Sequence, residues 1–158
     1  MEMTYHTPLS ASVQSALGIT PPAPLAMADQ VRFSELDVLQ HVNNAVYLSW
    51  FERVRVRYLQ LNGGTPVNGA GLRVVLRSGT IHYIKEMRLD EKYVVTCGCT
   101  AYRNTSFTMR QTLWVAGELR AQFDCVLVLL NPDGSGRFPI PEALKQKFRD
   151  VDGAVFEG

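Results

Sequence analysis

The sequence predicts a single α+β domain, in which one long helix lies against a curved antiparallel sheet of about five strands. Apolar side chains recur at helical spacing between Asn44 and Leu61. After that stretch the apolar period changes to two, over three consecutive segments. At 158 residues the chain is long enough for one well-formed core.

Composition and charge exclude several classes of protein. Hydrophobic residues make up 46% and charged residues 20%, which is typical of a folded domain and too apolar for a disordered chain. The formal charge is +1, so we expect no nucleic-acid partner. No segment approaches the roughly 20 continuous apolar residues of a membrane span, so we expect a soluble protein without one.

Residues 1–27 are expected to form a loose N-terminal arm before the domain at 28–158. The arm has no basic start and no continuous apolar core, which argues against a secretory signal. A short helix from Ser10 to Leu17 fits the pattern, but its apolar positions are too sparse to require one. The first expected strand is a short alternating segment from Gln30 to Phe33.

The long helix is predicted from Asn44 to Leu61. Steps of four and three place Tyr47, Phe51, Val54, Tyr58 and Leu61 on one face, which Leu48, Trp50 and Leu59 widen. Asn43 or Asn44 can cap the start of this helix, and Gly63–Gly64 fits its end. Its aromatic residues can line an acyl tunnel, but we expect Trp50, Phe51 and Tyr58 to fill the core.

Four strands are predicted after the helix. The run from Leu72 to Met87 is expected to bend or bulge near Gly79. Three further strands have alternating apolar faces: Tyr93, Val95, Cys97, Cys99 and Ala101; Phe107, Met109, Leu113 and Val115; Leu119, Ala121, Phe123, Cys125, Leu127 and Leu129. Short connections at 103–106 and 116–118 predict antiparallel pairing. A turn at 131–134 and a short helix from Pro141 complete the chain.

The cysteines and histidines give little support to metal or disulfide chemistry. The three cysteines are an odd number without a disulfide pattern, which indicates reduced thiols packed in the core of an intracellular, cytoplasmic protein. The three histidines stand alone, so we expect no metal. Neither a nucleophile elbow nor a glycine-rich phosphate loop is present.

A polar loop enters the long helix and allows two interpretations. Asp37, His41, Asn43 and Asn44 precede its first turn. The free N–H groups of a helix start can stabilise an oxyanion, and a nearby carboxylate can attack or activate water, which suits ester or thioester cleavage. The same residue types are also what ordinary capping uses, and local physics alone favours capping.

A family resemblance reverses that preference. The run "DVLQHVNNAVYLSWFER", Asp37 to Arg53, resembles the signature of hotdog-fold acyl thioesterases of the 4-hydroxybenzoyl-CoA thioesterase type, in the branch with D-x-x-x-H-V-N-N-x-x-Y. Weaker similarity continues in "YIKEMRLDEKYVV", "RNTSFTMRQTL" and "GRFPIPEAL", so the resemblance covers about residues 28–149. It implies a hotdog fold that forms dimers or tetramers, with sites at the subunit interface.

The resemblance also assigns roles to residues. It implies that Asp37 is the catalytic carboxylate, as nucleophile or general base, and that the backbone N–H of Asn44 polarises the thioester carbonyl. His41 and Asn43 would shape the site, and Tyr47 would line it. A catalytic helix glutamate such as Glu52 belongs to a different hotdog branch; here it is more simply the partner of Arg55.

The implied substrate is an acyl-CoA, hydrolysed without a metal or redox cofactor. Arg88, Arg103 and Arg110 are candidates to bind CoA, and Ser106 lies in the turn where many members have a serine before an aromatic residue. Plant acyl-ACP thioesterases have asparagine at the position of Leu39, so this departure weakens the alternative that ACP is the carrier. A non-catalytic acyl-binding hotdog protein, in which Asp37 only caps, is the other alternative. A hotdog dehydratase would need a differently placed histidine.

Overall fold

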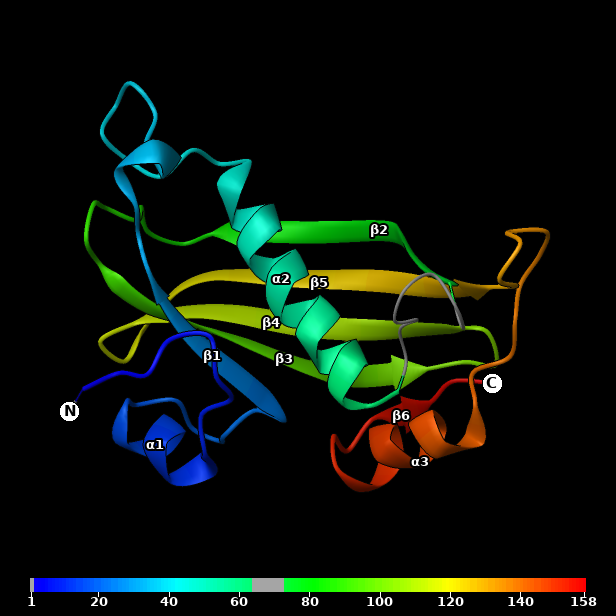
Figure 1. Ribbon diagram of the computed structural model, residues 1–158. Helices are drawn as coiled ribbons and strands as arrows, with labels where there is room; N and C mark the ends of the chain where they lie inside the picture. The colour runs from blue at the N-terminus through cyan, green and yellow to red at the C-terminus, as the bar shows by residue number, and fades with distance from the viewer. Residues whose placement is uncertain (1, 64–72) are drawn as a thin grey trace.

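In the computed structural model, which describes residues 2–63 and 73–158, one long helix crosses the concave side of a curved sheet (Figure 1). In chain order the elements are α1 (Ala11–Ala16), β1 (Leu25–Gln30), the 3-10 helix η1 (Phe33–Glu35), α2 (Val46–Leu61), β2 (Arg73–Tyr83), β3 (Lys92–Tyr102), β4 (Ser106–Val115), β5 (Glu118–Leu130), α3 (Glu142–Asp150) and β6 (Val155–Phe156).

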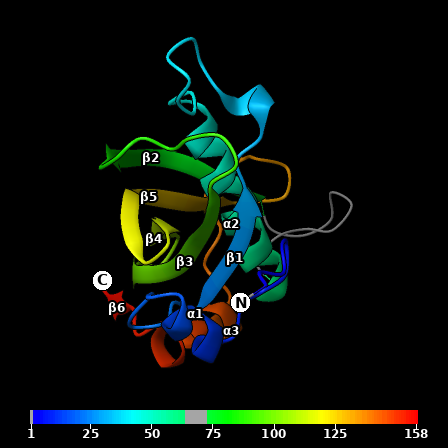
Figure 2. The ribbon, with the colours of Figure 1, turned by 90° about the vertical axis from the view of Figure 1, so that its left-hand side faces the viewer.

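The sheet confirms the predicted α+β class. Its strand order is β1-β3-β4-β5-β2, and all neighbours on this path are antiparallel. The short strand β6 lies off this path and pairs in parallel with β3. Figure 2 shows the sheet curving around α2.

Helix α2 begins two residues later than predicted and ends at the predicted Leu61. Leu48 and Leu61, both expected on the buried face, are exposed at 44% and 50%. Asn62 is the C-cap of the helix. Gly63 follows it with a φ of +68°, the left-handed conformation that glycine adopts most readily. Gly64 lies outside the described residues. No helix in the described ranges is long and apolar enough to cross a membrane.

The main core lies between α2 and the concave face of the sheet. Trp50, Phe51 and Tyr58 are each 1% exposed, which confirms that they fill the core. Trp50 stacks on Tyr93 with ring centroids 4.3 Å apart, and Phe51 stacks on Phe123 at 5.5 Å. The three cysteines are buried and free, as the core-packing prediction requires. Burial raises the pKa of each cysteine thiol.

The first strand was predicted at the wrong place. β1 spans Leu25–Gln30, and the predicted segment after Gln30 leads instead into η1. Leu25 and Met27 face the main core, while Ala26 and Ala28 face a second cluster under the N-terminal segment. Because both faces of β1 are buried, its first four residues form a continuous apolar run rather than an alternating one.

The N-terminal segment is not a loose arm. Its helix α1 forms within the expected range, and Ile19 packs against Ala26 and Ala28. Gln14, 2% exposed, donates to the carbonyls of Leu9 and Ala23 and accepts from the Ala23 N–H. The N–H groups of His6 and Leu9 donate to the carbonyls of Ala28 and Ala26, at 3.1 and 2.8 Å, and so attach the segment to β1. The domain boundary at residue 28 stays a prediction.

Strand β2 has its irregularity near Gly79, as predicted. The register with β5 shifts between Leu76 and Ser78, just before Gly79. Gly79 meets a different constraint, because a Cβ there would lie 2.5 Å from the ring of Phe123. The predicted first residue of this strand, Leu72, lies outside the described residues.

The remaining strands and turns agree with the sequence predictions. β3, β4 and β5 pair in antiparallel order, and Ala116 and Gly117 join β4 to β5 with φ values of +48° and +77°. The turn predicted at 131–134 closes with a hydrogen bond from the Gly134 N–H to the Asn131 carbonyl. Helix α3 follows Pro141, which occupies the N-cap.

Asp152 ties the C-terminal segment to the rest of the domain. One of its carboxylate oxygens accepts hydrogen bonds from the Tyr58 hydroxyl and from the Cys99 N–H. The other oxygen is buried without a partner among the described residues. Burial raises the pKa of Asp152 above its ordinary value of 3.8, although both hydrogen bonds act in the opposite direction.

This carboxyl predicts a specific pH dependence of stability. Between pH 3.8 and its raised pKa, the folded chain keeps a proton that the unfolded chain has lost. The free-energy cost of burying the charged form of Asp152 is therefore lost as pH falls and the carboxylate takes up a proton. We expect the unfolding free energy of wild type to rise relative to that of Asp152→Asn between pH 7 and pH 4. Urea titrations measure the difference, and a constant difference across this range would contradict the expectation.

Candidate active site

The loop between η1 and α2 is a closed turn organised by Asp37. Leu36 and Val42 form an isolated antiparallel bridge, and the Asp37 N–H donates to the His41 carbonyl at 2.8 Å. Asp37 Oδ1 accepts from the N–H groups of Leu39 at 2.8 Å and His41 at 3.4 Å. Oδ2 of Asp37 has no hydrogen-bond partner among the described residues, so half of this carboxylate is available to another molecule.

A turn before α2 leaves the Asn44 N–H free. The N-cap of α2 is Ala45, without a side-chain capping bond, so the predicted cap at Asn43 or Asn44 is wrong. Asn43 Oδ1 instead accepts from the Ala45 N–H at 2.9 Å, within the turn that precedes the helix. The N–H of Asn43 donates to Glu35 and that of Val46 to Asn43. The Asn44 N–H, in contrast, has no acceptor in the part of the chain that the structure describes.

These groups line one hollow of about 430 Å³. Five residues singled out in the sequence meet there: Asp37, His41, Asn43, Asn44 and Tyr47. The opposite wall comes from the end of β2 and the loop after it, through Tyr83, Ile84, Lys85 and Glu86. Sequence reasoning missed this wall, because nothing in a single sequence shows that a segment some 40 residues away faces the polar loop.

Tyrosine side chains join the two walls of the hollow. The Tyr83 hydroxyl donates to the Asn44 carbonyl at 2.9 Å, which fixes the residue that carries the free N–H. The Tyr83 ring meets Tyr47 edge to face, with centroids 5.0 Å apart. Tyr47 is 3% exposed, and burial raises the pKa of its hydroxyl, so this hydroxyl stays protonated near neutral pH.

Charged side chains in the opposite wall are already paired. A hydrogen bond from Arg88 at 2.9 Å lowers the pKa of Glu86, and the charge of His41 contributes in the same direction. Lys85 lies 3.2 Å from Glu118. Of the two carboxylates in the hollow, Glu86 therefore has a cationic partner, whereas Asp37 has only backbone donors.

Three residues predicted to bind substrate lie elsewhere in the single chain. Arg103 and Ser106 line a separate hollow of about 250 Å³ with Arg77, and Arg103 pairs with Glu157 at 3.7 Å. Arg110 pairs with Asp124 at 2.8 Å. The structure therefore does not bring these side chains to the Asp37 hollow, because they lie on β4 and on its connection to β3, whereas the hollow is formed at the start of α2 and the end of β2. Their contact with a substrate stays a prediction.

Glu52 does not take part in the hollow. Its side chain is 70% exposed and lies 4.0 Å from Arg55, the partner proposed from the sequence. Among the described residues, no group of three or more histidine, cysteine, aspartate or glutamate side chains is placed to hold a metal ion.

Comparison with known proteins identifies relatives of the chain. The profile of the thioesterase-like superfamily matches residues 31–148. A thioesterase-superfamily structure from Jannaschia sp. CCS1 is 42% identical, with 96% of this chain and 97% of that chain covered and a TM-score of 0.90. A thioesterase from Thermus thermophilus, complexed with coenzyme A and Zn, is 30% identical, with 85% and 98% covered and a TM-score of 0.72.

A third solved structure is similar over a shorter part of the chain. A predicted thioesterase from Bacillus stearothermophilus is 26% identical, with 79% of this chain and 93% of that chain covered and a TM-score of 0.72. No curated protein matches the chain. The curved sheet around one long helix is therefore the hotdog fold that these thioesterase structures share.

Proposed function

The chain belongs to the thioesterase-like superfamily, and on that premise we propose that it is an acyl-CoA thioesterase of the 4-hydroxybenzoyl-CoA thioesterase type. The family and its structural neighbours support thioester hydrolysis as the general reaction. The run from Asp37 to Arg53 supports the finer assignment, because it resembles the D-x-x-x-H-V-N-N branch. The products are a free carboxylic acid and CoA.

One observation carries the proposal: Asp37 and Asn44 line the same hollow, and each has a group without a partner among the described residues, Oδ2 of Asp37 and the N–H of Asn44. The N–H is placed at the start of α2, where the helix dipole favours negative charge. A thioester carbonyl oxygen bound there would gain stabilisation as it becomes an oxyanion. In this proposal the polar residues of the loop both hold the turn before α2, through Asn43, and serve catalysis.

In the proposed reaction Asp37 acts at the carbonyl carbon. As a nucleophile, it attacks this carbon and forms an acyl-aspartyl anhydride, which water then hydrolyses. As a general base, it takes a proton from water while the water oxygen attacks. In both routes the carbon–sulfur bond breaks and CoA leaves as a thiolate, a leaving group stable enough near neutral pH to need no strong acid. His41 and Asn43 shape the hollow, and Tyr47 lines it.

Support for CoA as the carrier comes from a relative and from the arginines. The 30% identical Thermus thermophilus thioesterase has coenzyme A in its structure. In this chain Arg88 lies beside the hollow through its contact with Glu86, and Arg77 and Arg103 line the second hollow. Guanidinium groups are suited to binding phosphates. We propose that Arg103, Arg110 and Ser106 contact CoA in an assembled oligomer.

Comparison of matched acyl-CoA and acyl-ACP substrates tests the carrier. Leu39, which stands where plant acyl-ACP thioesterases have asparagine, is 69% exposed at the tip of its loop and does not line the hollow. With the same acyl group on both carriers, we expect higher kcat/KM for the CoA thioester. Higher kcat/KM for the ACP thioester would favour the alternative of an acyl-ACP thioesterase.

We also propose that the protein is a homodimer, or a tetramer of two such dimers, formed through β2. The outer edge of β2 has no strand partner in the described ranges. Leu76 and Ile84 expose 50% and 55% of their surface there, and Val38 at the tip of the polar loop exposes 95%. Unpaired edges and exposed apolar side chains favour association.

Sedimentation tests this assembly. At micromolar concentration we expect the mass of a dimer or tetramer, and a shift to monomer in Leu76→Asp, because the new charge would be buried at the interface. A matched change on the far surface, Val151→Asp at a residue 58% exposed, should leave the mass unchanged. A stable wild-type monomer would contradict the proposal.

A further inference from the structure

The wall of the hollow opposite Asp37 begins with residues 84–86, and all three form hydrogen bonds with Arg120, near the start of β5. The Arg120 carbonyl accepts from the N–H groups of Ile84 at 2.9 Å and Lys85 at 3.2 Å. Its guanidinium donates to the Glu86 carbonyl at 2.9 Å. The backbone and the side chain of Arg120 therefore hold the same stretch of wall from two directions.

The guanidinium also fastens the far end of this wall segment, residues 84–91. Two of its nitrogens donate to the two carboxylate oxygens of Glu91, at 3.2 and 3.1 Å. Glu91 in turn accepts from the Arg88 N–H at 2.8 Å, which closes the turn before β3. Arg120 is 7% exposed, so these contacts form largely out of water, where a bidentate ion pair is strong and its loss is costly. A second carboxylate, that of Glu118, lies 2.6 Å from Arg120 Nε.

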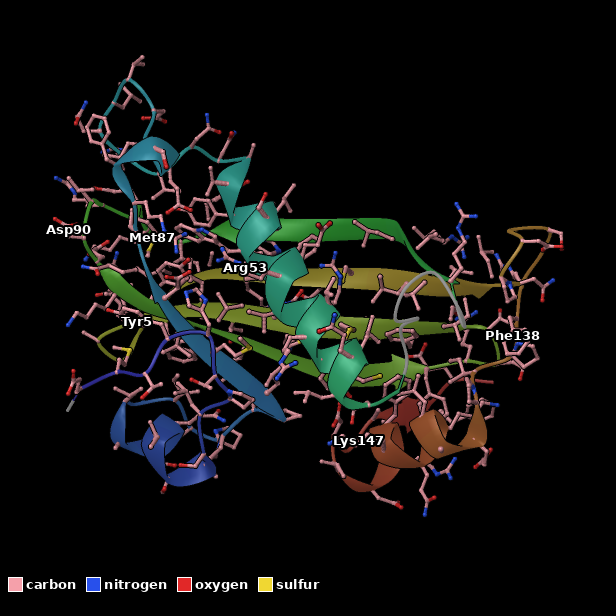
Figure 3. All side chains as sticks on the ribbon, viewed as in Figure 1. Tyr5, Arg53, Met87, Asp90, Phe138 and Lys147 are labelled. Atoms are coloured by element: carbon pink, nitrogen blue, oxygen red, sulfur yellow. The ribbon has the colours of Figure 1, made fainter. Side chains whose placement is uncertain are left out.

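The wall segment is joined to the catalytic loop through Met87, which is fully buried. The Met87 carbonyl accepts from the Val42 N–H at 2.9 Å. Val42 stands between His41 and Asn43, so the position of Met87 fixes both sides of the turn that leads to Asn44. Figure 3 shows Met87 and Asp90 toward the end of the molecule that carries the polar loop, and Phe138 and Lys147 at the opposite end.

We propose that Arg120 is a positioning residue, whose guanidinium holds the 84–91 wall against Val42 and thereby sets the placement of Asp37 relative to the Asn44 N–H. The inference rests on the proposed thioesterase function and adds to it a residue that contacts no reacting atom. Small displacements of reacting groups lower turnover far more than they lower affinity. Loss of the guanidinium should therefore act on kcat rather than on KM.

The test compares variants that remove the guanidinium with one that weakens the fold elsewhere. Arg120→Met keeps a similar apolar stem without the charge, and Arg120→Lys keeps a charge that can reach only part of the contacts. Asp152→Ala is the control, because it removes a buried carboxylate near α3, at the end of the molecule away from the polar loop (Figure 1). Kinetics on an acyl-CoA that wild type hydrolyses, urea titration and amide hydrogen exchange at Val42 are measured for each.

We expect Arg120→Met to lower kcat by about 10- to 100-fold, with KM within about twofold of wild type. Arg120→Lys should recover part of this loss. Exchange of the Val42 amide should accelerate in Arg120→Met by more than its loss of global stability explains, whereas Asp152→Ala should change neither kcat nor the relative protection of Val42.

Two results would overturn the inference: a kcat of folded Arg120→Met equal to that of wild type, or an equal fall in kcat in Asp152→Ala at the same loss of stability. If wild type hydrolyses no acyl-CoA, the proposed function fails separately, and exchange at Val42 still decides whether Arg120 holds the wall.

Discussion

Asp37→Asn should lower kcat/KM for acyl-CoA hydrolysis by about 10²- to 10⁴-fold, the range expected for loss of a catalytic base or nucleophile. The amide has nearly the same shape as the carboxylate but no charge with which to attack the carbonyl or take a proton from water. Its oxygen can still accept from the N–H groups of Leu39 and His41, so the loop should keep its fold. Initial rates of thiol release measure the effect.

Glu52→Gln is the matched control for this variant. Glu52 is also an acid close to the site in sequence, yet its side chain is 70% exposed and does not line the hollow. We expect its kcat/KM to stay within about twofold of wild type, as is usual for a surface substitution away from the chemistry. If Glu52→Gln were inactive and Asp37→Asn fully active, the helix glutamate would be the catalytic acid and the assignment of Asp37 would be wrong.

Asn44→Pro should lower kcat by about 10²- to 10³-fold, the usual effect of removing one oxyanion donor. Proline deletes a backbone N–H before α2 that has no acceptor in the described ranges. Residue 44 precedes Ala45, the N-cap of α2, so proline there removes no hydrogen bond of the helix. Steady-state kinetics, together with circular dichroism to verify the helix, would measure the change.

Asn44→Ala separates the backbone from the side chain at this position. Alanine keeps the N–H and removes only the exposed amide side chain, so kcat should fall much less than in Asn44→Pro. Equal losses in the two variants would show that the side chain, not the N–H, acts on the substrate. Full activity of a folded Asn44→Pro would remove Asn44 from the proposed mechanism.

Much of the fold follows from local sequence because the period of apolar residues reports which face is buried. The helix at 46–61 and the strands after Lys92 each turn an apolar face toward the main core, and their apolar periods show it directly, although Val94 of β3 also packs in the second cluster. β1 has no such period, since Leu25 faces one cluster and Ala26 another. Only the placement of the N-terminal segment over the sheet explains why both faces are apolar.

The candidate site also has a part that local sequence predicts and a part that it does not. Asp37, His41, Asn43, Asn44 and Tyr47 are neighbours in sequence, so a loop entering a helix brings them together, and the family resemblance supplies their roles. Tyr83 reaches the hollow through the pairing of β2 with β5, which is a long-range contact. Met87, four residues later, contacts Val42 of the polar loop. Arg120 is further removed still, because it acts on the wall and not on the hollow itself. Such contacts leave no periodic signal in the chain.

Thiol release from a panel of short, long and aromatic acyl-CoA substrates tests whether this hollow hydrolyses acyl-CoA thioesters. We predict that wild type hydrolyses at least one of them with kcat/KM of about 10⁴ M⁻¹s⁻¹ or more, the lower end of the usual range for enzymes. If no substrate in the panel is hydrolysed faster than in buffer, the protein binds acyl groups without catalysis and Asp37 only closes its loop.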